Sequence, residues 1–134
     1  MKSTLVDSNV LIDLFDERSE WRDWSDAMLT RAAARGPLVI NPIVFAEVAA
    51  GFSSIEDVEA ALPEAYVRRE PLPWSAAFLA GRAFVQYKRR GGTMSAPLPA
   101  FYIGAHAAVA GHTLLTRDAR RYRFYFPTLK VIAP

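Results

Sequence analysis

The 134-residue sequence contains no cysteine, which excludes disulfides, thiolate metal sites and a cysteine nucleophile. It also lacks an apolar run long enough to span a bilayer, since the longest, residues 103–111, is interrupted by His106. An acid at position 7 comes too early for the hydrophobic region of a signal peptide. No glycine-rich phosphate loop is present. We therefore expect one soluble, cytoplasmic domain over residues 1–134, with no membrane contact.

Acidic residues are scarce in the second half of the chain. Residues 1–70 carry 13 acids against 7 Lys and Arg, whereas residues 71–134 carry one acid, Asp118, against 9 Lys and Arg. Thirteen of the 16 cations are arginines, whose guanidinium groups make forked contacts with phosphate. The asymmetry indicates an acidic partner, nucleic acid above all, or two faces that neutralise each other within a dimer.

Short apolar segments alternate with helical patterns, and no repeat or linker divides the chain. Strands are expected at residues 3–6, 38–40, 66–69, 114–116 and 130–133, and helices at residues 9–15, 21–32, 43–50, 55–62, 76–87 and 99–110. Asn41-Pro42 is typical of a helix start, because Asn caps and Pro needs no N–H there. This alternation predicts an α/β fold, a small parallel sheet of about four or five strands with helices on both faces.

Three acids stand at positions that point to a metal. Asp7 follows the first expected strand, Asp118 follows the strand at 114–116, and Glu47 lies within an apolar segment. Ligands bind outside the carboxyl ends of parallel strands, and a buried carboxylate needs a cation. Mg²⁺ or Mn²⁺ suits such oxygen ligands. The alternatives are that Asp7 only caps the helix that begins near residue 9, that Asp118 caps the segment starting at residue 119, and that Glu47 faces outward or pairs with an arginine.

Three segments resemble the PIN-domain ribonucleases, in particular the VapC toxins of bacterial type II toxin–antitoxin pairs. They read Leu-Val-Asp-Ser-Asn-Val-Leu-Ile-Asp at 5–13, Asn-Pro-Ile-Val-Phe-Ala-Glu at 41–47 and Thr-Arg-Asp-Ala-Arg-Arg-Tyr at 116–122. The resemblance covers essentially the whole chain and implies a PIN-like fold and a Mg²⁺-dependent endoribonuclease. It implies a homodimer, a VapB-type antitoxin whose C-terminal tail blocks the active site, and contact with DNA only through that antitoxin. By the same resemblance, the catalytic and metal-binding acids are Asp7, Glu47 and Asp118, supported by Asn9 and Thr116.

One position departs from the family pattern. Family members typically carry an acid just after the proline that opens the late helix, but this chain reads Pro97-Leu98-Pro99-Ala100-Phe101. An acid at position 100 would suit the first turn of a helix, which attracts negative charge, whereas Ala100 supplies neither a ligand nor a charge. We therefore expect an inactivated variant in which the fold, the dimer and antitoxin binding survive.

The basic half supplies candidate contacts for an RNA substrate, which we expect to be a tRNA or another structured RNA. The candidate phosphate contacts are Arg89, Arg90, Arg117, Arg120, Arg121 and Arg123; a solvated face or dimer salt bridges are the alternative. The aromatic residues at 122 and 124–126 either stack on bases or pack in the core. His106 and His112 are expected to have structural roles rather than catalytic ones.

Two other functions fit parts of the sequence. A phosphotransfer-type α/β protein also places an aspartate after its first strand, but the phosphatase pattern requires a second aspartate where this chain has Asn9. The other alternative is a catalytically inert module that binds RNA or an antitoxin, as Ala100 would allow. RNA cleavage with and without Mg²⁺ separates these possibilities.

Overall fold

A parallel sheet organises residues 2–134, the part of the chain that this computed structural model describes. Its five strands lie in the order β3-β2-β1-β4-β5, so β1 is central. All four pairings are parallel, and Thr4 lies opposite both Leu38 and Thr113. The predicted α/β fold is confirmed. The strands are β1 (Thr4–Val6), β2 (Leu38–Ile40), β3 (Val67–Arg69), β4 (Thr113–Leu115) and β5 (Val131–Ile132).

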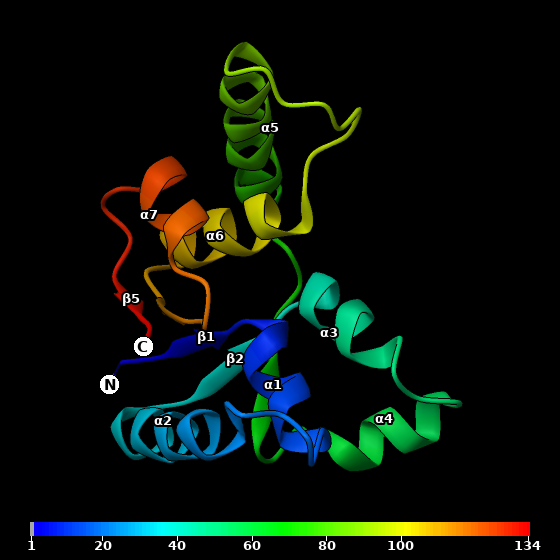
Figure 1. Cartoon of the computed structure of the whole chain (residues 1–134). Coiled ribbons are helices and arrows are strands. Elements are labelled where there is room, and N and C mark those ends of the chain that lie inside the picture. Colours follow the sequence, from blue (N-terminus) through cyan, green and yellow to red (C-terminus); the bar gives the residue numbers. More distant parts are fainter. Residues whose placement is uncertain (1) are drawn as a thin grey trace.

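Helices cover both faces of the sheet (Figure 1). On one side lie α1 and α2; on the other, α6 lies along the sheet and packs against α5 and α7. The helix α3 begins directly after β2 and is followed by α4. The helices of the described residues are α1 (Ser8–Phe15), α2 (Arg22–Arg35), α3 (Pro42–Ala49), α4 (Ile55–Ala61), α5 (Trp74–Arg89), α6 (Pro99–Ala110) and α7 (Arg120–Tyr125).

The core lies on both faces of the three middle strands. Every residue of β1, β2 and β4 is buried, and Leu5, Val39 and Leu114 have no exposed surface. Strands covered on both faces are apolar throughout rather than alternating with polar residues. Consequently, the polar groups that follow each strand gather at the edge of the sheet.

Two predicted helix boundaries are confirmed by their hydrogen bonds. The Oδ1 atom of Asn41 accepts from the Val44 N–H at 3.0 Å, which caps α3, and Pro42 occupies its first position. Gly111 ends α6 with φ +73°, a left-handed conformation that glycine adopts without strain. In residues 2–134, no helix is both long enough and apolar enough to cross a membrane.

The helix α7 was not predicted. Tyr122 and Phe126 are buried and four residues apart, the spacing of one helix face, but the less buried Phe124 and Tyr125 between them obscure that pattern. Gly104 of α6 makes room for α7, because a Cβ there would lie 2.5 Å from the Phe126 ring. This close approach brings Tyr122 to the carboxyl edge of the sheet.

A candidate carboxylate pocket at the carboxyl edge of the sheet

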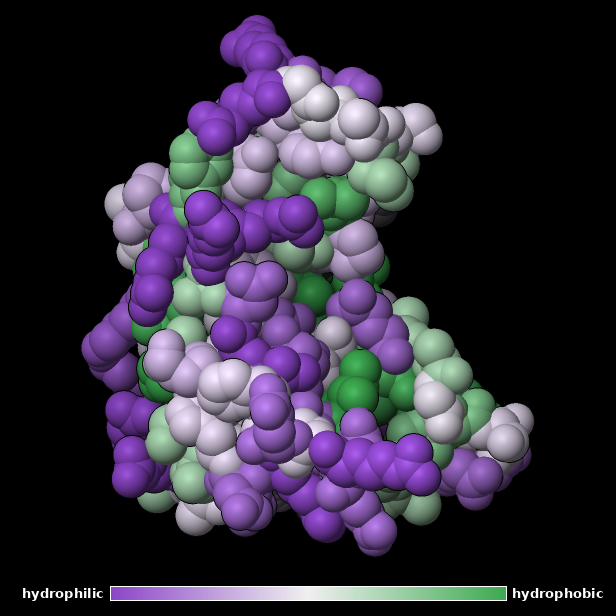
Figure 2. Space-filling view, in the orientation of Figure 1, coloured by the Kyte–Doolittle hydropathy of each residue, from purple (hydrophilic) through white to green (hydrophobic). Residues whose placement is uncertain are grey.

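A recess of about 230 Å³ lies between the first turns of α1 and α6 and the side of α3. Figure 2 shows the surface hollowed between the part formed by α5 and α6 and the part formed by α3. We call this recess the carboxylate pocket, because the three predicted acids line it. Its lining residues are Asp7, Ser8, Asn9, Glu47, Leu98, Pro99, Ala100, Ile103, Asp118, Arg121 and Tyr122.

Asp7 is the buried acid of the pocket, with 6% of its surface exposed. Its Oδ1 accepts from the Ser8 N–H at 2.8 Å, so it also caps α1. Its Oδ2 accepts from the hydroxyls of Thr116 at 2.8 Å and Tyr122 at 2.9 Å. Burial raises the pKa of Asp7 even though these hydrogen bonds oppose the shift, and the Asp118 charge adds to it. Asp7 thus caps α1 as expected, and within residues 2–134 its carboxylate forms no ion pair.

The sequence context of Glu47 predicted that apolar side chains would enclose it. In the structure Glu47 is only half-buried. Its Oε1 accepts from the Ser8 hydroxyl at 2.9 Å. The reason is that α3 turns Glu47 toward the recess while its neighbour Val48 faces the core. Burial, followed by the charge of Asp7, raises the pKa of Glu47 although the Ser8 bond opposes it. Within the described residues Glu47 forms no ion pair with an arginine.

The Thr116 hydroxyl holds the loop after β4 against α1. Besides donating to Asp7, its Oγ1 accepts from the Asp118 N–H at 3.1 Å and lies 3.4 Å from the Asn9 amide nitrogen. The Asn9 Oδ1 in turn accepts from the Arg117 N–H at 3.2 Å. The Asp118 side chain does not cap α7, and it lines the pocket instead. Asn9 and Thr116 therefore connect Asp7 with the loop that carries Asp118.

Ala100 is the second residue of α6 and lies on the pocket wall. An acid there would face the other three carboxylates, whereas a methyl group offers no oxygen ligand. In residues 2–134, the three pocket acids do not bring their oxygens within 4.8 Å of one another. The all-oxygen set fits Mg²⁺ or Mn²⁺, and burial, which is the main cause of the raised pKa values of Asp7 and Glu47, is a cost that a bound cation would offset. The donor set thus fits a hard divalent ion, although Ala100 contributes no ligand to it.

A second recess continues from the pocket along α7 and the end of α5, and we call it the basic recess. It is lined by three of the predicted arginines together with exposed and half-buried aromatics. Figure 2 shows hydrophilic side chains gathered over α7 and the far end of α5. Asp118 and Arg121 line both recesses. The lining residues are Arg90, Asp118, Arg120, Arg121, Phe124 and Tyr125.

The remaining predicted arginines are placed differently. Arg117 points away from the recess, with its Nε 2.7 Å from Asp13 Oδ2 and its guanidinium over the Trp21 ring. This ion pair gives Arg117 a structural role. Arg89 and Arg123 are exposed and line neither recess.

Two residues contribute to the pocket in roles that the sequence did not predict, although Tyr122 was considered as a base-stacking or core aromatic. Ser8 links Asp7 to Glu47 through its N–H and its hydroxyl, and Tyr122 donates to Asp7. Burial and the neighbouring carboxylates raise the pKa of Tyr122, so its hydroxyl remains a donor. The position of Ser8 directly after the first acid was the available signal for its role. Nothing local marked Tyr122.

The chain thus combines a parallel α/β fold, three acids at the carboxyl edge of its sheet and an arginine-lined recess beside them. The chain belongs to the PIN-domain family, whose match covers residues 4–127. Proteins of this family are in general nucleases. No curated protein matches the sequence at a significant level.

Several solved structures share this fold at low sequence identity. VapBC2 from Rickettsia felis, bound to a promoter DNA fragment, is 16% identical with a TM-score of 0.75, covering 98% of each chain. VapBC-1 from nontypeable Haemophilus influenzae is 18% identical with a TM-score of 0.73, covering 98% of this chain and 97% of that one. FitAcB from Neisseria gonorrhoeae is 20% identical with a TM-score of 0.66, covering 96% of each. At these identities the likeness establishes the fold.

Proposed function

We propose that this chain is a VapC-type toxin whose PIN domain is an endoribonuclease dependent on Mg²⁺ or Mn²⁺, impaired here by Ala100. The observation that carries the proposal is the carboxylate pocket, in which Asp7, Glu47 and Asp118 meet at the carboxyl edge of the sheet and Ala100 occupies the remaining wall. The family match sets aside the phosphotransfer alternative. The inert binding module remains the competing function, because it requires only the loss at position 100.

Asp7, Glu47 and Asp118 would hold the metal, which when bound acts as a Lewis acid and lowers the pKa of a water molecule. Thr116 and Tyr122 keep the Asp7 carboxylate oriented. Glu47 leaves its Oε2 without a protein hydrogen bond in the described residues, so this oxygen is placed to accept a proton from the attacking water. The raised pKa of Glu47 suits such a base.

The basic recess supports RNA as the substrate. Arg90, Arg120 and Arg121 are exposed beside the acids and carry the charge that phosphates require. Phe124 is 43% exposed, and the Arg90 guanidinium lies 4.1 Å from its ring centroid, a platform on which an unpaired base can stack. A single-stranded RNA that crosses the basic recess would reach Asp118, because Asp118 lines both recesses.

Exposed apolar side chains support the proposal that this chain binds protein partners. Trp74 and Phe78 of α5 are 91% and 70% exposed and lie one helical turn apart, and we expect a second copy of the chain to cover them. A largely apolar groove of about 380 Å³ that includes Phe45 and Ile55 would receive the antitoxin. The solved neighbours are complexes of this kind, and DNA would be reached through the antitoxin.

The decisive experiment is the Ala100→Asp variant. We expect it to cleave RNA in Mg²⁺ and to stop in chelator, while the parent chain cleaves at least about 100-fold more slowly. Ser75→Asp is the matched control, because Ser75 is the second residue of the exposed first turn of α5 and lies outside the pocket. Mapping the ends cut in total RNA would identify the substrate. An Ala100→Asp protein that folds and binds Mg²⁺ but does not cleave RNA would contradict the nuclease proposal.

A further inference from the structure

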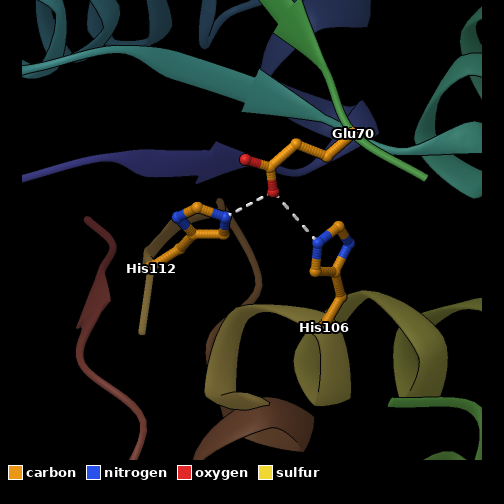
Figure 3. A group of neighbouring side chains, drawn as sticks. All are labelled: Glu70, His106 and His112. Carbon is orange, nitrogen blue, oxygen red and sulfur yellow. Dashed lines mark hydrogen bonds and ion pairs between the residues drawn. The ribbon is translucent and has the colours of Figure 1, made fainter. Parts of the chain in front are cut away.

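A second polar cluster lies outside the carboxylate pocket, and we call it the histidine cluster. Glu70 follows β3, His106 belongs to α6, and His112 precedes β4; the three side chains converge between the sheet and α6 (Figure 3). The Nε2 atoms of His106 and His112 lie 3.2 Å and 2.7 Å from the same Oε1 of Glu70. Both histidines are buried, and the Glu70 side chain is 25% exposed.

We propose that the histidine cluster is a metal site of its own, which binds Zn²⁺ or a similar transition-metal ion through Glu70, His106 and His112. Two imidazoles and one carboxylate form the donor set of open zinc sites, where water takes the fourth position. Nitrogen ligands favour Zn²⁺, whereas the all-oxygen carboxylate pocket favours Mg²⁺. The two sites thus differ in the ion they select.

The distances fit an ion after a small movement of Glu70. Two ligand atoms of a tetrahedral Zn²⁺ lie about 3.3 Å apart, and Glu70 Oε1 is already 3.2 Å from the His106 Nε2. The 2.7 Å distance to His112 must open by roughly half an ångström, which the partly exposed carboxylate allows. One candidate ligand atom from each residue lies within 4.8 Å of the others. In the metal-free cluster, the protons of the two imidazole–carboxylate hydrogen bonds occupy the space that an ion would take.

The outer contact of His112 allows its Nε2 to exchange a proton for an ion. Its Nδ1 contacts the Ser3 hydroxyl, which can accept the Nδ1 proton. In the metal-free protein the 2.7 Å bond to the Glu70 carboxylate places the proton on Nε2; when an ion takes Nε2, the proton moves to Nδ1, where the Ser3 hydroxyl accepts it. Such an outer partner is what orients most metal-binding histidines.

His106 must change tautomer to bind an ion. Because Asn41 Oδ1 caps α3 by accepting from Val44, its Nδ2 faces the His106 Nδ1 at 3.0 Å. The amide therefore donates to Nδ1, and the proton of this imidazole resides on Nε2. An ion at Nε2 requires a proton on Nδ1 and an acceptor beside it. Asn41 consequently weakens the site, so its substitution provides a specific test.

The cluster connects helices that form the carboxylate pocket. Asn41 caps α3, which carries Glu47, and His106 lies on α6, which carries Ala100. An ion bound here would link β3, α6 and the start of β4 and would hold α6 in place. We therefore expect it to stabilise the fold by mass action.

The test is titration of tag-free protein with Zn²⁺ by calorimetry in millimolar Mg²⁺, with Co²⁺ as a spectroscopic probe of tetrahedral ligation. We expect one Zn²⁺ per chain and a melting temperature raised by about 2–8 °C. Glu70→Gln and His112→Gln, which keep the side-chain size, should lower the affinity about tenfold or more. Asp118→Asn, in the carboxylate pocket, should leave Zn²⁺ binding unchanged.

Asn41→Asp sharpens the test, because an aspartate keeps the helix cap and presents an acceptor to His106 Nδ1. We expect this variant to bind Zn²⁺ about tenfold more tightly. Unchanged affinity would overturn the assignment of His106 as a ligand. A folded parent that binds no Zn²⁺, or Zn²⁺ binding abolished by Asp118→Asn but kept in His112→Gln, would overturn the site. None of these readouts depends on RNA cleavage.

Discussion

Helix α1 has a buried carboxylate near each end, and the two have opposite surroundings. Asp13, 2% exposed, pairs with Arg117 at 2.7 Å and accepts from the hydroxyls of Ser19 at 2.8 Å and Ser25 at 2.6 Å. Asp7, 6% exposed, accepts only from neutral donors and forms no ion pair in the described chain.

The difference separates a structural carboxylate from one suited to a ligand. A buried charge is costly unless a partner compensates it, and the protein provides that partner for Asp13. For Asp7 the cost remains, as its raised pKa shows. This unpaired carboxylate at the edge of the sheet is the feature on which the proposed metal site depends.

The largest expected effect comes from neutralising Asp7 in the proposed active variant. Asp7→Asn in the Ala100→Asp background should lower RNA cleavage by about 100-fold or more, because a metal ligand is lost. Asp57→Asn makes the same chemical change on the exposed helix α4 and serves as the control. Equal cleavage rates for the two variants would contradict the role of Asp7.

Neutralising Asp13 should instead damage the fold. Asp13→Asn leaves Arg117, whose side chain is 30% exposed, without its partner, and we expect a loss of about 1–3 kcal/mol in the free energy of unfolding. Urea denaturation of Asp13→Asn, Arg117→Gln and the double variant measures the coupling between them. Additive effects would show that the ion pair does not stabilise the protein.

The contact between α6 and α7 can be tested at Gly104. Gly104→Ala places a methyl group against the Phe126 and Tyr122 rings, so we expect a destabilisation of about 1–3 kcal/mol and a displaced Tyr122. Gly81→Ala is the control, since a Cβ there meets nothing within 4 Å and alanine should stabilise α5 by about 0.5–1 kcal/mol. Thermal denaturation measures both; equal shifts would contradict the close packing of α7.

The smallest effect is expected from Asp7→Asn on stability in the absence of metal. Folding raises the pKa of Asp7, so ionisation of this carboxyl destabilises the folded state. This destabilisation is absent below about pH 4 and grows as the pH rises toward the raised pKa. Asparagine removes this cost, and we expect the melting temperature at neutral pH to rise by about 2–5 °C. The gain should vanish in acid; a gain independent of pH would require another cause.

The sequence contained enough to predict the sheet and the places of the acids. Buried strands leave continuous apolar runs, Asn41 and Gly111 mark helix ends by local chemistry, and Asp7 and Asp118 follow strands directly. These signals are short-range. They depend on residues that are adjacent in the sequence, so the sequence alone reveals them.

Contacts between distant residues could not be predicted in this way. Tyr122 reaches Asp7 across 115 positions, and Glu70 meets His112 across 42, without any local pattern that marks the pairing. The half-exposed setting of Glu47 depends on the rotation of α3 against its neighbours. The helix α7 was missed because the aromatics at positions 124 and 125 hide the helical spacing of Tyr122 and Phe126.

The loop after β4 fastens α1 at two points through consecutive residues. Thr116 bonds to Asp7 and Arg117 pairs with Asp13, positions about 9 Å apart along a helix. A helix fixed at two points can neither slide along its axis nor fray independently of that loop. In native-state hydrogen exchange, the amides of α1 and those of residues 116–118 should therefore open as one cooperative unit.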